Sequence, residues 1–95
     1  MLESKFKKQT IERIKDRFPS LDLDFITPLS RSMPDTFIIA PHVWAALEFK
    51  RSEISPHRPN QDYHILRLNR KGYATFVYPE NVEEVLDDLE VLFLS

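Results

Sequence analysis

The sequence predicts a small α+β fold, within the broad α/β class, in which helices flank a mixed β-sheet. Its 95 residues suit a single domain over residues 1–95, and a hydrophobic content of 42% suffices for one modest core. The spacing of apolar residues indicates elements in the order helix, three strands, helix, strand, helix (α-β-β-β-α-β-α). Because a strand, a crossover helix and a second strand form a parallel pair, whereas a tight hairpin is antiparallel, the sheet should be mixed.

The first predicted element is a helix over residues 3–17, which Pro19 ends. At about 100° per residue, Phe6 and the other large apolar residues fall on one broad face. Glu3 lies near the middle of that face, whereas Glu12 lies on the opposite side. Only Glu3 should therefore point toward the sheet.

Short apolar segments bounded by prolines and polar residues predict the strands. The segments are residues 21–26, 36–40, 44–50 and 73–78. Pro41 and His42 form the short turn of the hairpin between the second and third strands.

Two further helices are predicted over residues 61–71 and 82–93. Asn60 is a good N-cap for the first of them. Gly72, the only glycine in the chain, stands where a left-handed residue ends a helix. Asn81, followed three residues later by Glu84, is close to a capping box that opens the last helix.

The composition excludes several kinds of site. Without cysteine no disulfide or thiolate metal site can form, and with one glycine there is no phosphate-binding P-loop. The histidines do not have metal-ligand spacing. No apolar run approaches the roughly 20 residues that span a bilayer, and residues 1–17 are charged rather than signal-like. We therefore expect no membrane association and a cytoplasmic location.

The net charge of −2 conceals an uneven distribution. Residues 1–17 carry six lysines and arginines against three acids, residues 50–71 carry six against two, and residues 79–95 carry six acids and no base. Two basic segments beside an acidic one suit a phosphate backbone, with the acidic helix turned away from it. Ordinary solvated helix faces explain the same charges equally well.

Asp35, Glu48 and Lys50 form the pattern that indicates chemistry. Positions 48 and 50 of a strand point to the same face, and a charged pair within an apolar strand is costly to bury without a purpose. If the hairpin pairs position 35 near 48, the two carboxylates project together from one end of the sheet. Such carboxylates repel each other unless a cation intervenes, and Mg²⁺ prefers oxygen ligands of this kind.

This set of residues suits hydrolysis of a phosphodiester. A divalent ion held by the carboxylates would polarise the phosphodiester, while Lys50 would hold or activate the attacking water and stabilise the developing negative charge. The same residues also have a structural interpretation, in which Glu48 and Lys50 are outward-facing strand residues and Asp35 caps a turn.

This chain contains the motif Pro34-Asp35, twelve intervening residues, and Glu48-Phe49-Lys50. The motif resembles the signature of the PD-(D/E)xK nuclease superfamily. The predicted order of elements also resembles the α-β-β-β-α-β, restriction-endonuclease-like core of that superfamily. The chain is most similar to stand-alone virus-type replication–repair nuclease (VRR-NUC) domains of phages, over about residues 3–86. It departs from their pattern before the motif, where Ser32-Met33 stands in place of a glycine.

The resemblance implies a role for each matching residue. Asp35, Glu48 and the backbone carbonyl of Phe49 would be metal ligands, and Lys50 would be the catalytic lysine. Glu3 corresponds to an acid of the first helix that joins the catalytic and metal-binding set; its other interpretation is a first-turn acid that complements the helix dipole.

Gln61 corresponds to a catalytic glutamine that opens the helix after the motif strand. It shares a helix face with Ile65 and Leu68, so it should point toward the sheet; its other interpretation is a half-buried polar residue of the first turn. Basic residues of the 50–71 segment should contact DNA phosphates: Arg51, Arg58, Arg67 and Lys71.

The resemblance implies a Mg²⁺-dependent endodeoxyribonuclease, with Mn²⁺ as a substitute ion. Its substrates would include branched or Holliday-type DNA, it would act as a homodimer, and a phage-encoded chain would work in the cytoplasm of the host cell. A domain this small also benefits from burying further surface in a symmetric dimer. The alternative is a non-catalytic nucleic-acid or protein-interaction module that retains the fold; a small-molecule-binding α/β domain has no supporting motif.

Overall fold

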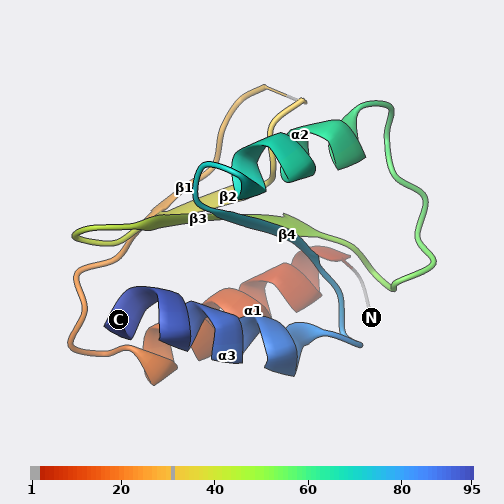
Figure 1. Cartoon of the computed structure of the whole chain (residues 1–95). Coiled ribbons are helices and arrows are strands. Elements are labelled where there is room, and N and C mark those ends of the chain that lie inside the picture. Colours follow the sequence, from red (N-terminus) through yellow and green to blue (C-terminus); the bar gives the residue numbers. More distant parts are fainter. Residues whose placement is uncertain (1–2, 31) are drawn as a thin grey trace.

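The computed structural model of the chain describes residues 3–30 and 32–95, apart from the side chain of Glu3, as a four-stranded sheet with helices on both faces (Figure 1). The elements are α1 (Glu3–Arg17), β1 (Asp24–Ile26), β2 (Thr36–Ile39), β3 (Trp44–Phe49), α2 (Gln61–Asn69), β4 (Tyr73–Val77) and α3 (Val82–Leu94). In the sheet order β1-β2-β3-β4, the first two pairs are antiparallel and β4 runs parallel to β3. The predicted element order and mixed sheet are confirmed.

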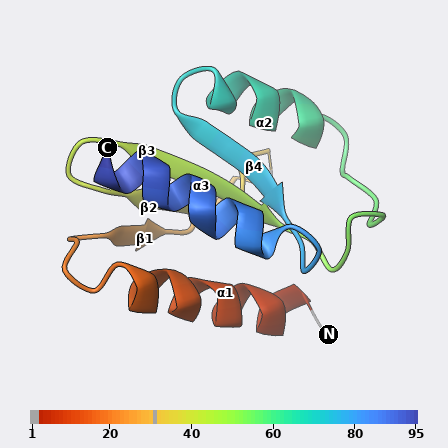
Figure 2. The ribbon, with the colours of Figure 1, turned by 60° about the horizontal axis from the view of Figure 1, so that its bottom comes forward.

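The helices divide into two layers. α1 and α3 lie side by side on one face of the sheet, and α2 covers the other face (Figures 1 and 2). The main core fills the space between the sheet and the α1–α3 pair, and a smaller cluster lies under α2. Because strand side chains alternate, β3 sends Leu47 and Phe49 into the main core and turns Ala46 and Glu48 toward α2.

The predicted orientation of α1 is confirmed by its buried side. Phe6, Thr10 and Ile14 are buried, whereas Glu12 is exposed. Glu3 is the first residue of α1. The side chain of Glu3 lies outside the described residues, so its role stays a prediction.

Gly72 follows α2 for a different reason from the one that the sequence indicated. Its φ is not positive, so the expected left-handed helix end is wrong. A Cβ atom at this position would lie 2.6 Å from two ring atoms of Trp44, which leaves room only for glycine. Tight packing against β3 therefore explains the residue. The helix ends at Asn69, two residues before the predicted end.

Neither asparagine caps its helix through its side chain. Asn60 occupies the N-cap position of α2 in the left-handed conformation, with φ 71°, and makes no side-chain cap bond. Asparagine tolerates that conformation better than most residues do. The Asn81 side chain binds the backbone of Tyr78 and Phe76 at the end of β4 instead of the first turn of α3. Asn60 and Asn81 therefore occupy the predicted N-cap positions and both helices start where expected, but the side-chain bonds of a capping box do not form.

The strand predicted over residues 21–26 forms only from Asp24 onward. Leu21 and Leu23 are half-buried and pack against the main core from the connection between α1 and β1. In residues 21–23 the alternation of apolar and polar residues thus reflects burial of alternate side chains, without hydrogen bonds to a neighbouring strand.

Acidic residues of α3 pair with arginines of α1. Arg17 Nη2 lies 2.7 Å from Asp87 Oδ1 and 3.0 Å from Glu90 Oε1, and Arg13 pairs with Glu83. Part of the positive charge of residues 1–17 is therefore balanced within the protein, on the sheet face opposite α2. Within residues 3–30 and 32–95, no helix combines the length and the apolar character that crossing a membrane requires.

Candidate active site

The hairpin brings Asp35 and Glu48 together at one end of the sheet. The β2–β3 register sets Thr36 opposite Leu47, so the residues directly before and after them, Asp35 and Glu48, also face each other. Asp35 immediately precedes β2, which begins at Thr36 as predicted. The strand ends at Ile39, one residue before its predicted end. The predicted pairing of position 35 near 48 is confirmed.

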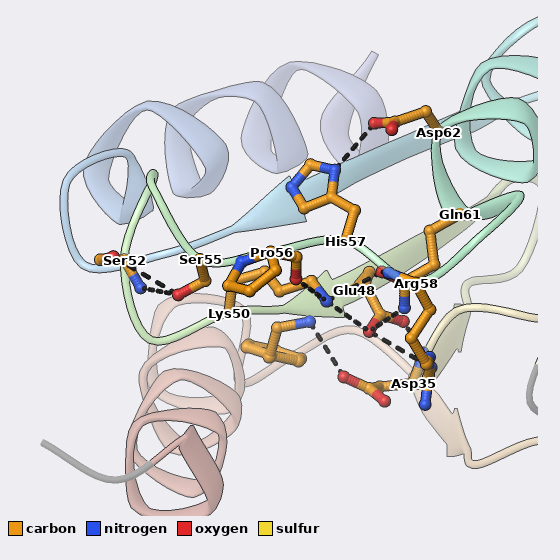
Figure 3. Close-up of polar contacts among 11 residues, drawn as sticks. Asp35, Glu48, Lys50, Ser52, Ser55, Pro56, His57, Arg58, Gln61 and Asp62 are labelled. Carbon is orange, nitrogen blue, oxygen red and sulfur yellow. Dashed lines mark hydrogen bonds and ion pairs between the residues drawn. The ribbon is translucent and has the colours of Figure 1, made fainter.

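Two hydrogen bonds join Asp35 to the end of β3 (Figure 3). The Asp35 backbone N–H donates to Glu48 Oε1 over 3.1 Å, and the Phe49 backbone N–H donates to Asp35 Oδ2 over 3.0 Å. The two carboxylates are thus held by the backbone of the neighbouring strand. These two hydrogen bonds position Asp35, although Ser32-Met33 stands where the motif usually has a glycine.

Lys50 directly follows β3 and remains attached to the neighbouring strand, since its backbone N–H donates to Val77 O of β4 over 2.8 Å. Its side chain is 10% exposed and its Nζ lies 3.9 Å from Glu48 Oε2. The ammonium donates to Gln61 Oε1 over 2.8 Å and to the Pro56 carbonyl over 3.3 Å. Glu48 and Lys50 therefore face the same side, as predicted, but they are buried under α2 and the 50–60 connection instead of facing solvent.

Gln61 connects the lysine to the glutamate. It opens α2, is 5% exposed, and donates from Nε2 to Glu48 Oε2 over 3.0 Å. Its Oε1 accepts from Lys50 Nζ and from the Arg58 backbone N–H, each over 2.8 Å. All the hydrogen-bonding directions of the amide except one N–H are accounted for by these contacts. The prediction that Gln61 points toward the sheet is confirmed.

Arg58 adds a second positive charge beside the glutamate. Its Nη2 lies 3.8 Å from Glu48 Oε2, and its side chain is 51% exposed, whereas that of Glu48 is 4% exposed. Figure 3 shows the arginine reaching toward the Glu48 carboxylate. A buried carboxylate therefore meets two cations, one from the strand end and one from the connection.

Burial raises the pKa of Glu48 above its ordinary value, and the nearby charge of Asp35 raises it further. Lys50, Arg58 and the backbone N–H of Asp35 oppose this increase without cancelling it. The loss of hydration of the Glu48 carboxylate is therefore only partly offset by the neighbouring cations and the backbone N–H.

The donor set fits a hard divalent cation. Asp35 and Glu48 supply carboxylate oxygens, and Asp35 Oδ1 accepts no hydrogen bond from the described part of the chain. A cation would also relieve the repulsion that raises the pKa of Glu48. No group of three or more acids or histidines converges anywhere in residues 3–30 and 32–95, the Glu3 side chain aside. The remaining ligands would therefore come from a backbone carbonyl, from Glu3 or from water, which Mg²⁺ usually retains.

The four residues expected to contact DNA separate into two groups. Arg51 and Arg58 are exposed on the connection that follows β3, and Arg58 Nη2 lies 3.8 Å from Glu48 Oε2. Arg67 lies six residues along α2 from Gln61, about 9 Å along the helix axis, and Lys71 lies beyond the helix end. Of these four residues, Arg58 is the one whose side chain lies within 4 Å of a carboxylate of the candidate site.

Sequence reasoning missed the part of the site that the 50–60 connection contributes. The Pro56 carbonyl binds Lys50, and a carbonyl leaves no trace in a sequence. His57 stays exposed, but its ring stacks on Phe76 with centroids 4.1 Å apart and its Nδ1 lies 2.9 Å from Asp62 Oδ1. The spacing of His57 and Asp62, five residues apart across a helix start, was the only signal for this contact.

No family model matches the sequence, and no curated protein matches it. A solved structure described as "VRR_NUC domain" is similar to the chain, with a TM-score of 0.57 and 22% sequence identity. The likeness covers 84% of this chain and 92% of that one. The chain therefore has the fold of a VRR-NUC domain, the PD-(D/E)xK-like fold that its motif and element order predicted.

Proposed function

We propose that this chain is a divalent-metal-dependent endonuclease that hydrolyses DNA phosphodiester bonds. One observation carries the proposal: Asp35 and Glu48 are held side by side through backbone hydrogen bonds, with Lys50 beside them. Burial of Glu48 and Lys50 at a strand end, beside half-buried Asp35, is unfavourable for stability alone. The VRR-NUC fold supports the proposal, because the same residues match the superfamily motif.

Asp35 and Glu48 would hold a Mg²⁺ or Mn²⁺ ion, together with the Phe49 carbonyl and Glu3. When bound, this ion would supply Lewis acidity toward the phosphodiester and its attacking water. The Phe49 side chain is fully buried and packs edge-on against Phe6, with ring centroids 5.9 Å apart. That contact anchors the end of β3 and hence the backbone that would face the ion.

Lys50 would orient the attacking water and stabilise negative charge in the transition state. An ammonium group has three N–H donors, and the Pro56 carbonyl and Gln61 Oε1 accept two of them. The third is therefore available to a water or a phosphate oxygen. Because its two protein acceptors fix the ammonium, little reorganisation would be needed during the reaction.

A polyanionic substrate agrees with the charge distribution around this site. Arg58 lies next to Glu48 and Arg51 is exposed on the same connection, whereas the acidic residues of α3 lie on the opposite face of the sheet. The phosphate backbone would approach past the arginines without meeting α3. Arg67 and Lys71 would extend this contact along α2.

We further propose that two copies act together on branched or Holliday-type DNA. Each copy has one candidate active site and one set of basic residues, in the 50–71 segment. Two cuts on opposed strands of a four-way junction therefore require two chains. Light scattering on the free protein at micromolar concentration should give the mass of a dimer, and a monomer would contradict this part of the proposal.

The experiment is incubation of the purified protein with linear, nicked and four-way DNA in Mg²⁺, in Mn²⁺ or in EDTA. Cleavage in either metal and none in EDTA is expected, with the four-way DNA cut most rapidly. DNA binding without cleavage under every condition would instead support a non-catalytic binding module.

A further inference from the structure

We propose that Arg58 is a further catalytic residue, which balances the charge of Glu48 before a cation binds and binds the scissile phosphate afterwards. This inference rests on the proposed nuclease function and goes beyond the general DNA contact expected of a basic residue. It follows from the distances, the exposure and the backbone anchoring of Arg58.

Arg58 and Lys50 share one target in the cation-free protein. Their side-chain nitrogens lie 3.8 Å and 3.9 Å from the same atom, Glu48 Oε2. A divalent cation held by Glu48 would bring two further positive charges to this carboxylate. Coulombic repulsion would then act on both residues, and only one of them is free to respond.

Lys50 is the constrained member of the pair. Its ammonium is largely buried and donates to Gln61 and to the Pro56 carbonyl. Arg58 is half exposed, and 3.8 Å is too long for a hydrogen bond to Glu48. Its guanidinium donates no hydrogen bond to any residue within the described ranges, so its N–H groups remain available to a ligand.

The backbone of Arg58 is nevertheless fixed. Its N–H donates to Gln61 Oε1 over 2.8 Å, and the preceding residue, His57, is held by Phe76 and Asp62. Rotation of the side chain alone can therefore move the guanidinium from Glu48 toward a bound phosphate. No rearrangement of the connection is needed, which keeps the cost of the exchange low.

The charges of the site support this exchange. Asp35 and Glu48 balance Lys50 and Arg58, so a bound divalent cation leaves an excess of two positive charges. During hydrolysis the water oxygen bonds to phosphorus and loses a proton, while the bond from phosphorus to one sugar oxygen breaks and that oxygen gains a proton. The transition state of this displacement has more negative charge than the phosphodiester, and a planar guanidinium can bind two of its oxygens at once.

The test combines metal binding without DNA and cleavage with DNA, using the full chain. Arg58→Gln removes the charge, and Arg51→Gln is the matched control, because Arg51 is an exposed arginine of the same connection. In calorimetric titration with Mn²⁺ alone, Arg58→Gln should bind the ion about three- to tenfold more tightly than the wild type, since a competing charge is gone. Arg51→Gln should change Mn²⁺ affinity by less than about twofold, because its charge is not paired with Glu48.

In single-turnover cleavage at saturating DNA and Mg²⁺, Arg58→Gln should be slower than the wild type by about 100-fold. Arg58→Lys should keep the wild-type Mn²⁺ affinity and recover only part of the rate, because it lacks the planar fork. Unchanged or weaker Mn²⁺ binding by Arg58→Gln, or a wild-type rate at saturation, would overturn the inference while leaving the nuclease proposal intact. A wild-type protein that cleaves no DNA would instead overturn the nuclease proposal, and this inference with it.

Discussion

Replacing Gln61 with leucine should destabilise the protein far more than an ordinary polar-to-apolar change. The side chain is buried and makes three hydrogen bonds, to Glu48, to Lys50 and to the backbone N–H of Arg58. Leucine has a similar size, so the packing volume is largely kept. The partners lose their hydrogen bonds while remaining in place, and two of them are buried charged groups.

The expected loss follows from the nature of these bonds. Each of the two bonds to a charged partner contributes about 1.5–3 kcal/mol, and the bond to the backbone contributes about 1 kcal/mol. Leucine recovers part of this through its apolar surface, which leaves a net loss of about 3–5 kcal/mol. A chain of 95 residues has a total stability of roughly 5–14 kcal/mol. The loss is therefore a substantial fraction of the total stability.

Urea unfolding, followed through the fluorescence of Trp44, measures this loss as the difference in the free energy of unfolding. Gln9→Leu is the matched control, because Gln9 is an exposed glutamine of α1. The control should differ from the wild type by less than about 0.5 kcal/mol. A loss below about 1 kcal/mol for Gln61→Leu would contradict the hydrogen-bond network around Gln61.

Three further predictions concern the carboxylates, the lysine and the first helix. Because burial and the charge of Asp35 raise the pKa of Glu48, the Glu48 carboxyl group binds its proton more tightly in the folded protein than in the unfolded chain. The melting temperature of the cation-free wild type, relative to that of Glu48→Gln, should therefore fall as the pH rises above the ordinary pKa of 4.5. A relative increase in melting temperature would contradict the direction of the pKa shift. Lys50→Ala should lower single-turnover cleavage by about 100-fold while Mn²⁺ and DNA still bind, whereas lost Mn²⁺ binding with normal turnover would assign the lysine another role. Glu3→Gln should reduce cleavage far more than Glu12→Gln, and equal rates for the two variants would show that the first helix contributes no acid to the site.

The element order and the central residues of the site could be predicted from the sequence because both depend on local patterns. Alternation in the strands determines which side chains share a face, and this placed Glu48 and Lys50 together. The connection between β2 and β3 is so short that it determines the register of the two strands. This register places Asp35 next to Glu48. The helical period in the same way separated the buried face of α1 from exposed Glu12.

The errors arose where particular side-chain contacts, rather than a repeating pattern, determine the local structure. Gly72 matches a helix-end signal, yet the ring of Trp44, distant in sequence, is what requires it. Asn81 matches an N-cap signal, but its side chain binds the end of β4. The pairing of Arg58 with Glu48 depends on the path of an irregular connection, which no periodicity describes. These contacts become visible only once the chain is folded.

The central claim is that Asp35 and Glu48 together hold the cation that DNA hydrolysis requires. The direct test is to measure Mn²⁺ affinity and Mn²⁺-dependent cleavage of four-way DNA in one preparation of Asp35→Asn. Asparagine keeps an oxygen that can accept the hydrogen bond from the Phe49 N–H but removes the charge, so the fold should persist with an unchanged or higher melting temperature. The account predicts that this folded variant loses both Mn²⁺ binding and cleavage, whereas a folded variant that still cleaves DNA at the wild-type rate would contradict it.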